Sequence, residues 1–240
     1  MLLSIESSCD ESAIALFDKE EGVLYSAVHS QVATHTPFGG VVPELAVREH
    51  LQKFPELIAK LPIPLRELTA IAVTVGPGLM GSLAIGISLA KALALQLNIP
   101  LYGVNHLRGH VFSPFIPLHK ANPNTFCEVL GNHLPHLGLL VSGGNTILYS
   151  INREFDLTIV AKTCDDAAGE ALDKAAKMLG LGYPGGPLME KYASQALADE
   201  IVKIPALPIA FKGEKERLAF SFSGLKTSLR YFLQTLPSEE

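Results

Sequence analysis

Short apolar runs separated by polar turns open the chain. Three of these runs have the length and composition of strands, and they cover Leu2–Glu6, Ala13–Phe17 and Val23–Val32. The turn after the first run carries two carboxylates, Asp10 and Glu11. Such a turn is either a solvated hairpin tip or a place where hydroxyl, amide and carboxylate groups meet at one end of a sheet, as phosphate and metal sites require.

A helical period follows these strands. Apolar residues recur at steps of three and four from Val47 to Leu61, which predicts a helix with one apolar face. Pro43 suits the first turn of this helix. His50 lies beside the apolar face, so we expect it at the rim.

A buried strand, an apolar helix and a second strand come next, at 70–75, 79–97 and 101–104. The helix is long enough to cross a membrane. Its single charge, Lys91, would cost roughly 2.5–3.5 kcal/mol near the centre of a bilayer, and the helix also contains glycine, serine and glutamine. We therefore expect it to pack against a sheet, with no membrane association, in a β-β-β-α-β-α-β order.

The pattern restarts in the second half of the chain. Three further strands are predicted, at Leu137–Val141, Thr146–Ile151 and Leu157–Lys162. Asp165 and Asp166 are expected to cap a helix that runs to about Leu179, and two more helices follow at 188–198 and 224–236. This second β-β-β-α unit is an internal repeat. It predicts an N-terminal lobe at 1–110 and a C-terminal lobe at 111–240 that is shorter than a complete repeat.

Composition narrows the class of protein. Apolar residues make up 48% of the 240, and charged residues 18%, which is typical of a well-buried α/β protein and argues against disorder. The net charge is −5 and no long basic run occurs, so contact with nucleic acid would need local patches or partners. Three cysteines without a C-x-x-C pair, and no signal peptide, favour a cytoplasmic protein with reduced thiols. Residues 117–135 are predicted to form a surface loop with solvated histidines at 119, 133 and 136.

His106 and His110 are the candidate metal ligands. They are four residues apart and directly follow a predicted strand. If a helix begins at His106, both imidazoles lie on one helix face, close enough to hold one metal ion. The spacing alone also fits two histidines on a helix surface.

Eight motifs in the chain resemble those of one known family. They are Ile5-Glu6-Ser7-Ser8-Cys9-Asp10-Glu11, 38–46 (FGGVVPELA), 76–79 (GPGL), 106–110 (HLRGH), 140–144 (LVSGG), 165–174 (DDAAGEALDK), 183–187 (YPGGP) and 220–227 (FSFSGLKT). In this order they are similar to the TsaD family, the tRNA N6-adenosine threonylcarbamoyltransferases, formerly called Gcp or O-sialoglycoprotein endopeptidase. The duplicated strand pattern also resembles the actin-like ATPase fold of acetate kinase, sugar kinases, Hsp70 and actin.

The resemblance implies a reaction and its partners. The threonylcarbamoyl group of threonylcarbamoyl-adenylate would be transferred to N6 of the adenosine adjacent to the anticodon, in tRNAs that read codons starting with A. The expected partners are tRNA, a TsaB-like subunit in a heterodimer and a TsaE-like ATPase. The expected cofactors are one divalent metal ion, iron or zinc, and an adenine nucleotide, either threonylcarbamoyl-adenylate or ATP.

The resemblance also assigns site residues. His106 and His110 match metal ligands, and the substrate or nucleotide positions are Leu140, Val141, Ser142, Gly143, Gly144, Asp173, Gly186 and Glu190. We add the hypothesis that Glu11 removes a proton from the attacking amine, because of its place in the first polar turn.

Three departures from the family pattern leave alternatives open. Arg108 stands where the family usually has Glu, and Asn145 where it often has His. The family's later motifs, including an Asp that serves as third metal ligand, do not occur. A catalytically impaired, short actin-like partner subunit of the same tRNA-modification complex is therefore the alternative. A metalloprotease is disfavoured because 106–110 lacks the Glu of H-E-x-x-H, and an actin-like small-molecule kinase because the motifs point elsewhere.

Overall fold

The central strand of the larger sheet is β1, the first strand that the sequence predicts. In the computed structural model, which describes residues 1–198, 207–214 and 216–236, five strands form a sheet in the order β3-β2-β1-β4-β5. β1 pairs antiparallel with β2 and parallel with β4. The strands are β1 (Leu2–Glu6), β2 (Glu11–Asp18), β3 (Gly22–Ser30), β4 (Ala70–Gly76) and β5 (Leu101–Asn105).

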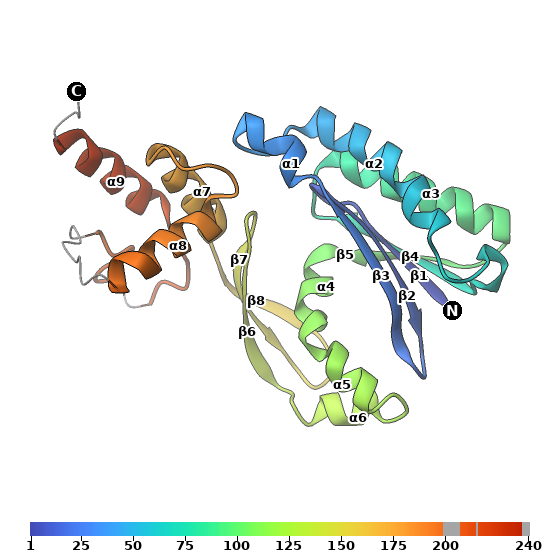
Figure 1. Cartoon of the computed structure of the whole chain (residues 1–240). Coiled ribbons are helices and arrows are strands. Elements are labelled where there is room, and N and C mark those ends of the chain that lie inside the picture. The colour runs from blue at the N-terminus through green and yellow to red at the C-terminus, as the bar shows by residue number, and fades with distance from the viewer. Residues whose placement is uncertain (199–206, 215, 237–240) are drawn as a thin grey trace. The chain divides into compact units, whose positions relative to one another are not determined.

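Helices cover one face of this sheet, and Figure 1 shows α2 and α3 lying across it. The helices of this part of the chain are α1 (Val32–His35), α2 (Pro43–Ala59), α3 (Met80–Leu97), α4 (His106–Phe112), α5 (Ile116–Ala121) and α6 (Phe126–Gly131). The chain divides into two compact units, Met1–His133 and Leu134–Glu240. The first unit has the predicted order of strands and long helices, with α1 added between β3 and α2.

The core of the first unit lies between the sheet and α2 and α3. Alternate residues of β1, Leu3 and Ile5, are buried and pack with Phe54 of α2 and Ala90 of α3. α3 is the one described helix that is long and apolar enough to cross a membrane. It packs on β4 and α2, as a core helix does.

The buried face of α2 differs from the predicted one. Ala46, His50, Phe54 and Leu57 are buried, whereas Leu51 is 56% exposed. The prediction that His50 is a rim residue was wrong, because its side chain is fully buried. Its ring nitrogens have hydrogen-bond partners, which offset the cost of burying them.

Residues 117–135 were predicted as a surface loop, but most of them form α5 and α6. His119 was expected to be solvated, yet its ring contacts the rings of Phe17 and Phe126 and its Nδ1 is buried. α5 packs against β3. These contacts attach the segment to the first unit, so the division falls after His133 and not at the predicted 110/111.

The second unit begins with three antiparallel strands in the order β6-β7-β8. They are β6 (His136–Val141), β7 (Thr146–Ile151) and β8 (Leu157–Lys162), and the helices that follow are α7 (Ala168–Met178), α8 (Gly185–Ala198) and α9 (Ser223–Thr235). The predicted β-β-β-α order is confirmed for this unit. The chain is therefore a mixed α/β protein.

Candidate functional site

A carboxylate stands at the carboxyl end of the central strand of the first unit. Glu6 is the last residue of β1, and the polar turn Ser7-Ser8-Cys9-Asp10 follows it. The backbone N–H of Ser8 donates to Oε1 of Glu6, and the hydroxyl of Thr74 on β4 donates to Oε2. Because β1 and β4 are parallel, they bring their polar ends to the same edge of the sheet.

His106 meets Glu6 at this edge. The Nδ1–H of His106 donates to Oε2 of Glu6 over 3.1 Å, and Nδ1 is 3.2 Å from the hydroxyl oxygen of Ser8. The local sequence explains why a helix begins here: the side-chain oxygen of Asn105 accepts hydrogen bonds from the N–H groups of Leu107 and Arg108. His106 is thus the first residue of α4.

His110 faces His106 one turn later, as predicted. The two Nε2 atoms are 3.1 Å apart, and the rings are nearly perpendicular. Two imidazole nitrogens that face each other share either one proton or one cation. The hydrogen bond to Glu6 leaves Nε2 of a neutral His106 free to act as the acceptor or ligand.

The charges of these groups are coupled. Burial alone would raise the pKa of Glu6, but hydrogen bonds from His106, Ser8 and Thr74 lower it to about 2. The hydrogen bond to Glu6 raises the pKa of His106, against the effect of its burial. Burial, with the neighbouring His106, lowers the pKa of His110. Glu6 is therefore an anion in the neutral pH range and holds the Nδ1 proton of His106.

The distance between the two histidine nitrogens would suit one divalent metal ion. Zinc–imidazole bonds of 2.0–2.1 Å would span the 3.1 Å between the nitrogens at an N–metal–N angle of about 100°, near the tetrahedral value. Glu6 completes the carboxylate–histidine arrangement that usually orients a metal-binding imidazole. Within 1–198, 207–214 and 216–236, no third His, Cys, Asp or Glu joins the pair to form a metal-binding group.

Glu11 lies at the first position of β2, where it is exposed and pairs with Ser30 of β3. Among the described contacts, none joins its carboxylate to His106 or His110. The structure therefore leaves the catalytic role predicted for Glu11 as a prediction.

The glycine-containing turn of the second unit lies between β6 and β7. Leu140 and Val141 end β6, and Ser142 closes the turn by exchanging hydrogen bonds with Asn145. A Cβ added at Gly143 or Gly144 would meet no atom within 4 Å. Neither glycine is therefore required by a protein neighbour on that side, and both leave backbone open to a ligand.

α7 contacts this turn and contains the predicted acidic residue Asp173. The N–H of Gly169 donates to the carbonyl of Ser142, with no room for a Cβ between them. Asp173 lies one turn further along α7. Its Oδ1 accepts hydrogen bonds from the N–H groups of Gly185 and Gly186, which begin α8. Asp173 therefore serves as the cap of α8, a role that the sequence did not suggest.

The remaining predicted substrate residue, Glu190, is on α8. It is exposed and lies four residues after Gly186, on the same face of the helix. The second unit thus brings the Ser142–Gly144 turn, Asp173 and Gly186 together through α7, and Glu190 continues the set along α8.

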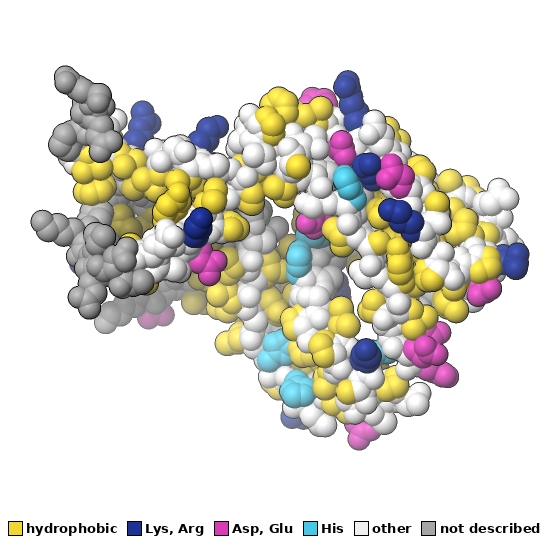
Figure 2. Space-filling view, in the orientation of Figure 1, with side chains coloured by type: hydrophobic (Ala, Val, Ile, Leu, Met, Phe, Trp, Pro, Cys, Tyr) yellow, Lys and Arg dark blue, Asp and Glu magenta, His cyan; other side chains and the backbone are white. Residues whose placement is uncertain are grey.

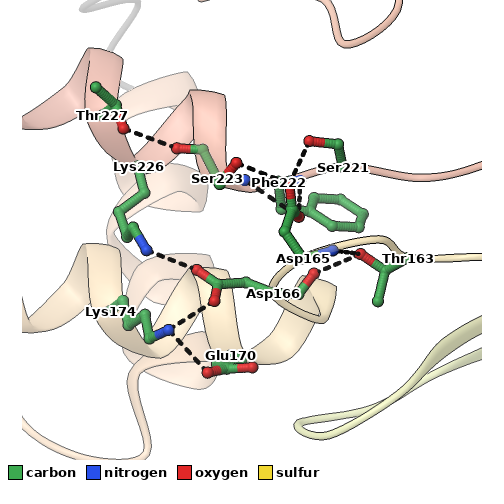
Figure 3. A network of polar contacts seen from close by, with 10 residues as sticks. All are labelled: Thr163, Asp165, Asp166, Glu170, Lys174, Ser221, Phe222, Ser223, Lys226 and Thr227. Carbon is green, nitrogen blue, oxygen red and sulfur yellow. Dashed lines mark hydrogen bonds and ion pairs between the residues drawn. The ribbon is translucent and has the colours of Figure 1, made fainter.

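Asp165 and Asp166 do not cap α7, contrary to the prediction. The N-cap residue of α7 is Ala167, whose side chain accepts nothing. Asp165 instead accepts hydrogen bonds from the hydroxyls of Ser221 and Ser223 and from the N–H groups of Phe222 and Ser223, at the start of α9 (Figure 3). The physical reason is that a tertiary neighbour offers four donors to this carboxylate.

Asp166 joins α7 and α9 through two lysines. Lys174 and Lys226 each form an ion pair with it, at 2.7 and 2.9 Å, and Lys174 also contacts Glu170 (Figure 3). Phe220 meanwhile pairs with Thr163 at the end of β8. Together, the contacts of Asp165 and Asp166 fix the beginning of α9 on the loop before α7.

Several residues of the site were missed as site residues by sequence reasoning. Glu6 was predicted only as the end of a strand, although a carboxylate at the carboxyl end of a central strand could have marked it. Nothing local marks Ser8 or Thr74 as its partners, because the contacts depend on β1 and β4 lying side by side.

Comparisons with known proteins agree on one family. The family described as "TsaD: tRNA N6-adenosine threonylcarbamoyltransferase" matches residues 22–237. A tRNA N6-adenosine threonylcarbamoyltransferase of Burkholderia multivorans is 46% identical over 233 residues, which are 95% of this chain and 63% of that protein. One of Fervidobacterium nodosum is 41% identical over 245 residues, 98% of this chain and 66% of that protein. The chain thus spans about two thirds of the length of these curated relatives.

Among solved structures, the chain is similar to YeaZ from Pseudomonas aeruginosa, with 16% identity and a TM-score of 0.37 over 70% of this chain and 65% of that one. The match of residues 22–237, together with relatives above 40% identity that cover nearly the whole chain, places the sequence within one family. The chain belongs to the TsaD family of tRNA N6-adenosine threonylcarbamoyltransferases.

Proposed function

We propose that this protein transfers the threonylcarbamoyl group of threonylcarbamoyl-adenylate to N6 of the adenosine adjacent to the anticodon, in tRNAs that read codons starting with A. The observation that carries the proposal is the pair of facing Nε2 atoms of His106 and His110, 3.1 Å apart and oriented by Glu6, in a chain of this family. A non-catalytic partner subunit would have no need of such an arrangement.

His106 and His110 would hold one divalent ion, iron or zinc. When bound, the ion supplies a Lewis acid for oxygens of the carbamoyl or phosphate group. Glu6 holds the Nδ1–H of His106 and so keeps Nε2 of this ring turned toward His110. Ser8 adds a hydroxyl beside the same ring.

The second unit would bind the adenylate part of the donor. Open backbone at Gly143 and Gly144 lets amide groups approach a phosphate. One oxygen of Asp173 is used by α8, and the other is left for a ribose hydroxyl, to which a carboxylate makes strong hydrogen bonds. Leu140 and Val141 lead into the turn, and Gly186 and Glu190 extend the binding surface along α8.

Glu11 would remove the proton from the attacking amine, since it is an exposed carboxylate at the start of β2, directly after the first polar turn. If Glu11→Gln kept the full rate of transfer, this role would be discarded. The expected tRNA contact needs partners or local charge, because the net charge of the chain is −5 and the sequence has no long basic run. Figure 2 shows Lys and Arg scattered over the visible face. The partners that we propose are a TsaB-like subunit and a TsaE-like ATPase. We also propose that the chain has an actin-like fold.

The test is transfer of labelled threonylcarbamoyl to tRNA. The 240-residue chain and a version extended through any in-frame downstream sequence would each be supplied with donor, tRNA and partner proteins, beside a His106→Ala/His110→Ala variant. We expect label in the tRNA that depends on both histidines. Transfer that is unaffected by the double variant, or absent from the extended protein, would overturn the proposal; the first result would favour a non-catalytic partner subunit.

A further inference from the structure

Four polar side chains are completely buried behind the first polar turn. Ser12, Gln31, His35 and His50 each have 0% exposure, and they come from β2, the β3–α1 connection, α1 and α2. Burying this many polar groups is unfavourable unless each has a hydrogen-bond partner. The site described above uses none of the four, so their arrangement requires its own explanation.

The protons of this network can be assigned from its two backbone ends. At one end the N–H of Val42 donates to Nδ1 of His35, so this nitrogen is an acceptor and the Nε2 of His35 carries the proton. That proton is donated to Oε1 of Gln31 over 3.1 Å. The amide nitrogen of Gln31 therefore points the other way, toward Nδ1 of His50 at 3.4 Å.

At the other end of the network, the contacts of His50 also assign the proton of the ring to Nε2. Nε2 of His50 is 3.0 Å from the carbonyl oxygen of Cys9, which can only accept, so Nε2 carries the proton. Nδ1 of His50 must then accept, and it receives the hydroxyl of Ser12 over 2.7 Å. Both rings are thus neutral with the proton on Nε2, and no other assignment satisfies every contact. Burial lowers the pKa of His50, which agrees with a neutral ring.

Two residues of this network form hydrogen bonds with the backbone of the polar turn, and His106 contacts the same turn through Ser8. Cys9 is fixed by His50, and the carbonyl of Asp10 accepts from the N–H of Gln31 over 2.9 Å. The next residue back, Ser8, has its carbonyl bonded to the N–H of Leu79 and its hydroxyl beside His106. The placement of the hydroxyl therefore depends on anchors on both sides of the turn.

We infer that His50 is a positioning residue of the candidate site: through the Cys9 carbonyl it fixes the Ser8 hydroxyl and the start of the turn against His106. The inference rests on the proposed function only in assigning the histidine pair a part in transfer. His50 itself touches neither the histidine pair nor a substrate group among the described contacts. A small displacement of such a turn is enough to lower a rate about tenfold or more.

The test combines NMR of the ¹⁵N-histidine-labelled chain with transfer kinetics of the complete system. In the unmodified chain we expect His35 and His50 to be neutral and protonated on Nε2; a proton on Nδ1 of His50, or a cationic ring, overturns the inference without any variant. His50→Leu is then compared with His50→Gln, whose amide can still donate to Cys9. We expect the ring resonances of His106 to move in the first and to return toward their original positions in the second.

In the transfer assay, His50→Leu is expected to lower kcat about tenfold, with KM for tRNA nearly unchanged, and His50→Gln to recover most of the rate. Equal losses in both variants, or His106 resonances that stay in place in His50→Leu, would show a merely structural role. If the complete system shows no transfer at all, the proposed function fails, while the NMR result still decides the inference.

Discussion

Glu6 and His106, separated by 100 positions in the chain, meet through a 3.1 Å hydrogen bond between a carboxylate oxygen and Nδ1. The contact arises because β1 and β5 both flank β4 in a parallel arrangement, so that the residue that ends β1 and the residue that follows β5 reach one edge of the sheet. The ring that Glu6 holds is the one that would bind a metal ion, which makes the carboxylate the most direct point at which to disturb the site.

Glu6→Gln is expected to weaken binding of Zn²⁺ to the chain by about 10–100-fold, the usual effect of losing the partner of a metal-bound imidazole. The amide keeps a hydrogen-bond acceptor but loses the negative charge that makes the ring a stronger ligand. Isothermal titration with Zn²⁺ alone measures the change. Glu67→Gln, an exposed carboxylate of the same unit, should leave the affinity as it is. Equal affinities for Glu6→Gln and the unmodified chain would remove Glu6 from the site.

Gly78→Ala is expected to destabilise the first unit by about 1–3 kcal/mol, the usual range for overpacking. An added Cβ would meet the backbone carbonyl and Cα of Ser8, and neither can move without shifting the polar turn. The hydrogen bond from Leu79 to Ser8 would lengthen as well. Urea denaturation gives the free energy of unfolding. Gly131→Ala in α6 is the control, since nothing lies within 4 Å of its Cβ, and it should be neutral or slightly stabilising.

Asp165→Ala is expected to lower the stability of the second unit by about 1 kcal/mol, as the loss of a helix cap does. The carboxylate accepts from the N–H of Phe222 at the start of α9 and from two hydroxyls. Denaturation followed by circular dichroism measures the effect. Glu154→Ala, in the β7–β8 hairpin, removes a carboxylate whose described contacts involve only its backbone and should change little.

The contribution of Asp165 should also depend on pH. Partial burial alone would raise its pKa, but hydrogen bonds from Ser221, Phe222 and Ser223 lower it from 3.8 to about 2. A carboxyl with a depressed pKa in the folded state contributes fully above its unfolded value and loses the contribution as the pH falls through the folded value. The stability difference between the unmodified chain and Asp165→Asn should therefore shrink between about pH 4 and pH 2. A difference that stays constant over this range would mean that the charge is not involved.

The strands and the polar turns at their ends were largely predictable from the sequence, whereas the partners of the polar groups were not. Alternation and run length give β1, β7 and β8 with their correct bounds. Hydrophobic periodicity failed at His50, because it counts a histidine as polar and cannot know that Ser12, Gln31 and Cys9 surround it. The helix-capping rule failed at Asp165, since this local rule takes no account of a helix that starts more than fifty residues later.

For the histidine pair, the sequence predicted the shared helix face but not the contact with Glu6. Spacing predicted correctly that His106 and His110 lie on one helix face, because four residues make about one helical turn. Neither the spacing nor the motif indicates that Glu6 holds one of the rings, since that contact requires the parallel order of β1, β4 and β5. Sequence thus predicts which residues share an element, and packing decides which elements share a site.

Asp173 offers a way to separate capping from ligand binding, because the proposed function gives its two oxygens different roles. Oδ1 accepts from the N–H groups of Gly185 and Gly186 at 2.8 and 3.3 Å, and we assign Oδ2 to the ribose of the donor. Asp173→Asn keeps one oxygen acceptor for α8 but loses the charge. Its stability should stay close to that of the unmodified chain, while its affinity for an adenylate falls.

Asp173→Ala loses both functions, so the free energy of unfolding should fall by about 1 kcal/mol in addition to the loss of affinity. Denaturation and AMP titration of the two variants, with Glu154→Ala as control, make the comparison. Were Asp173→Asn to bind AMP as tightly as the unmodified chain, the carboxylate would be a cap of α8 and nothing more. The ribose would then have to be bound elsewhere, and Glu190, exposed on the same helix face as Gly186, would be the next residue to test.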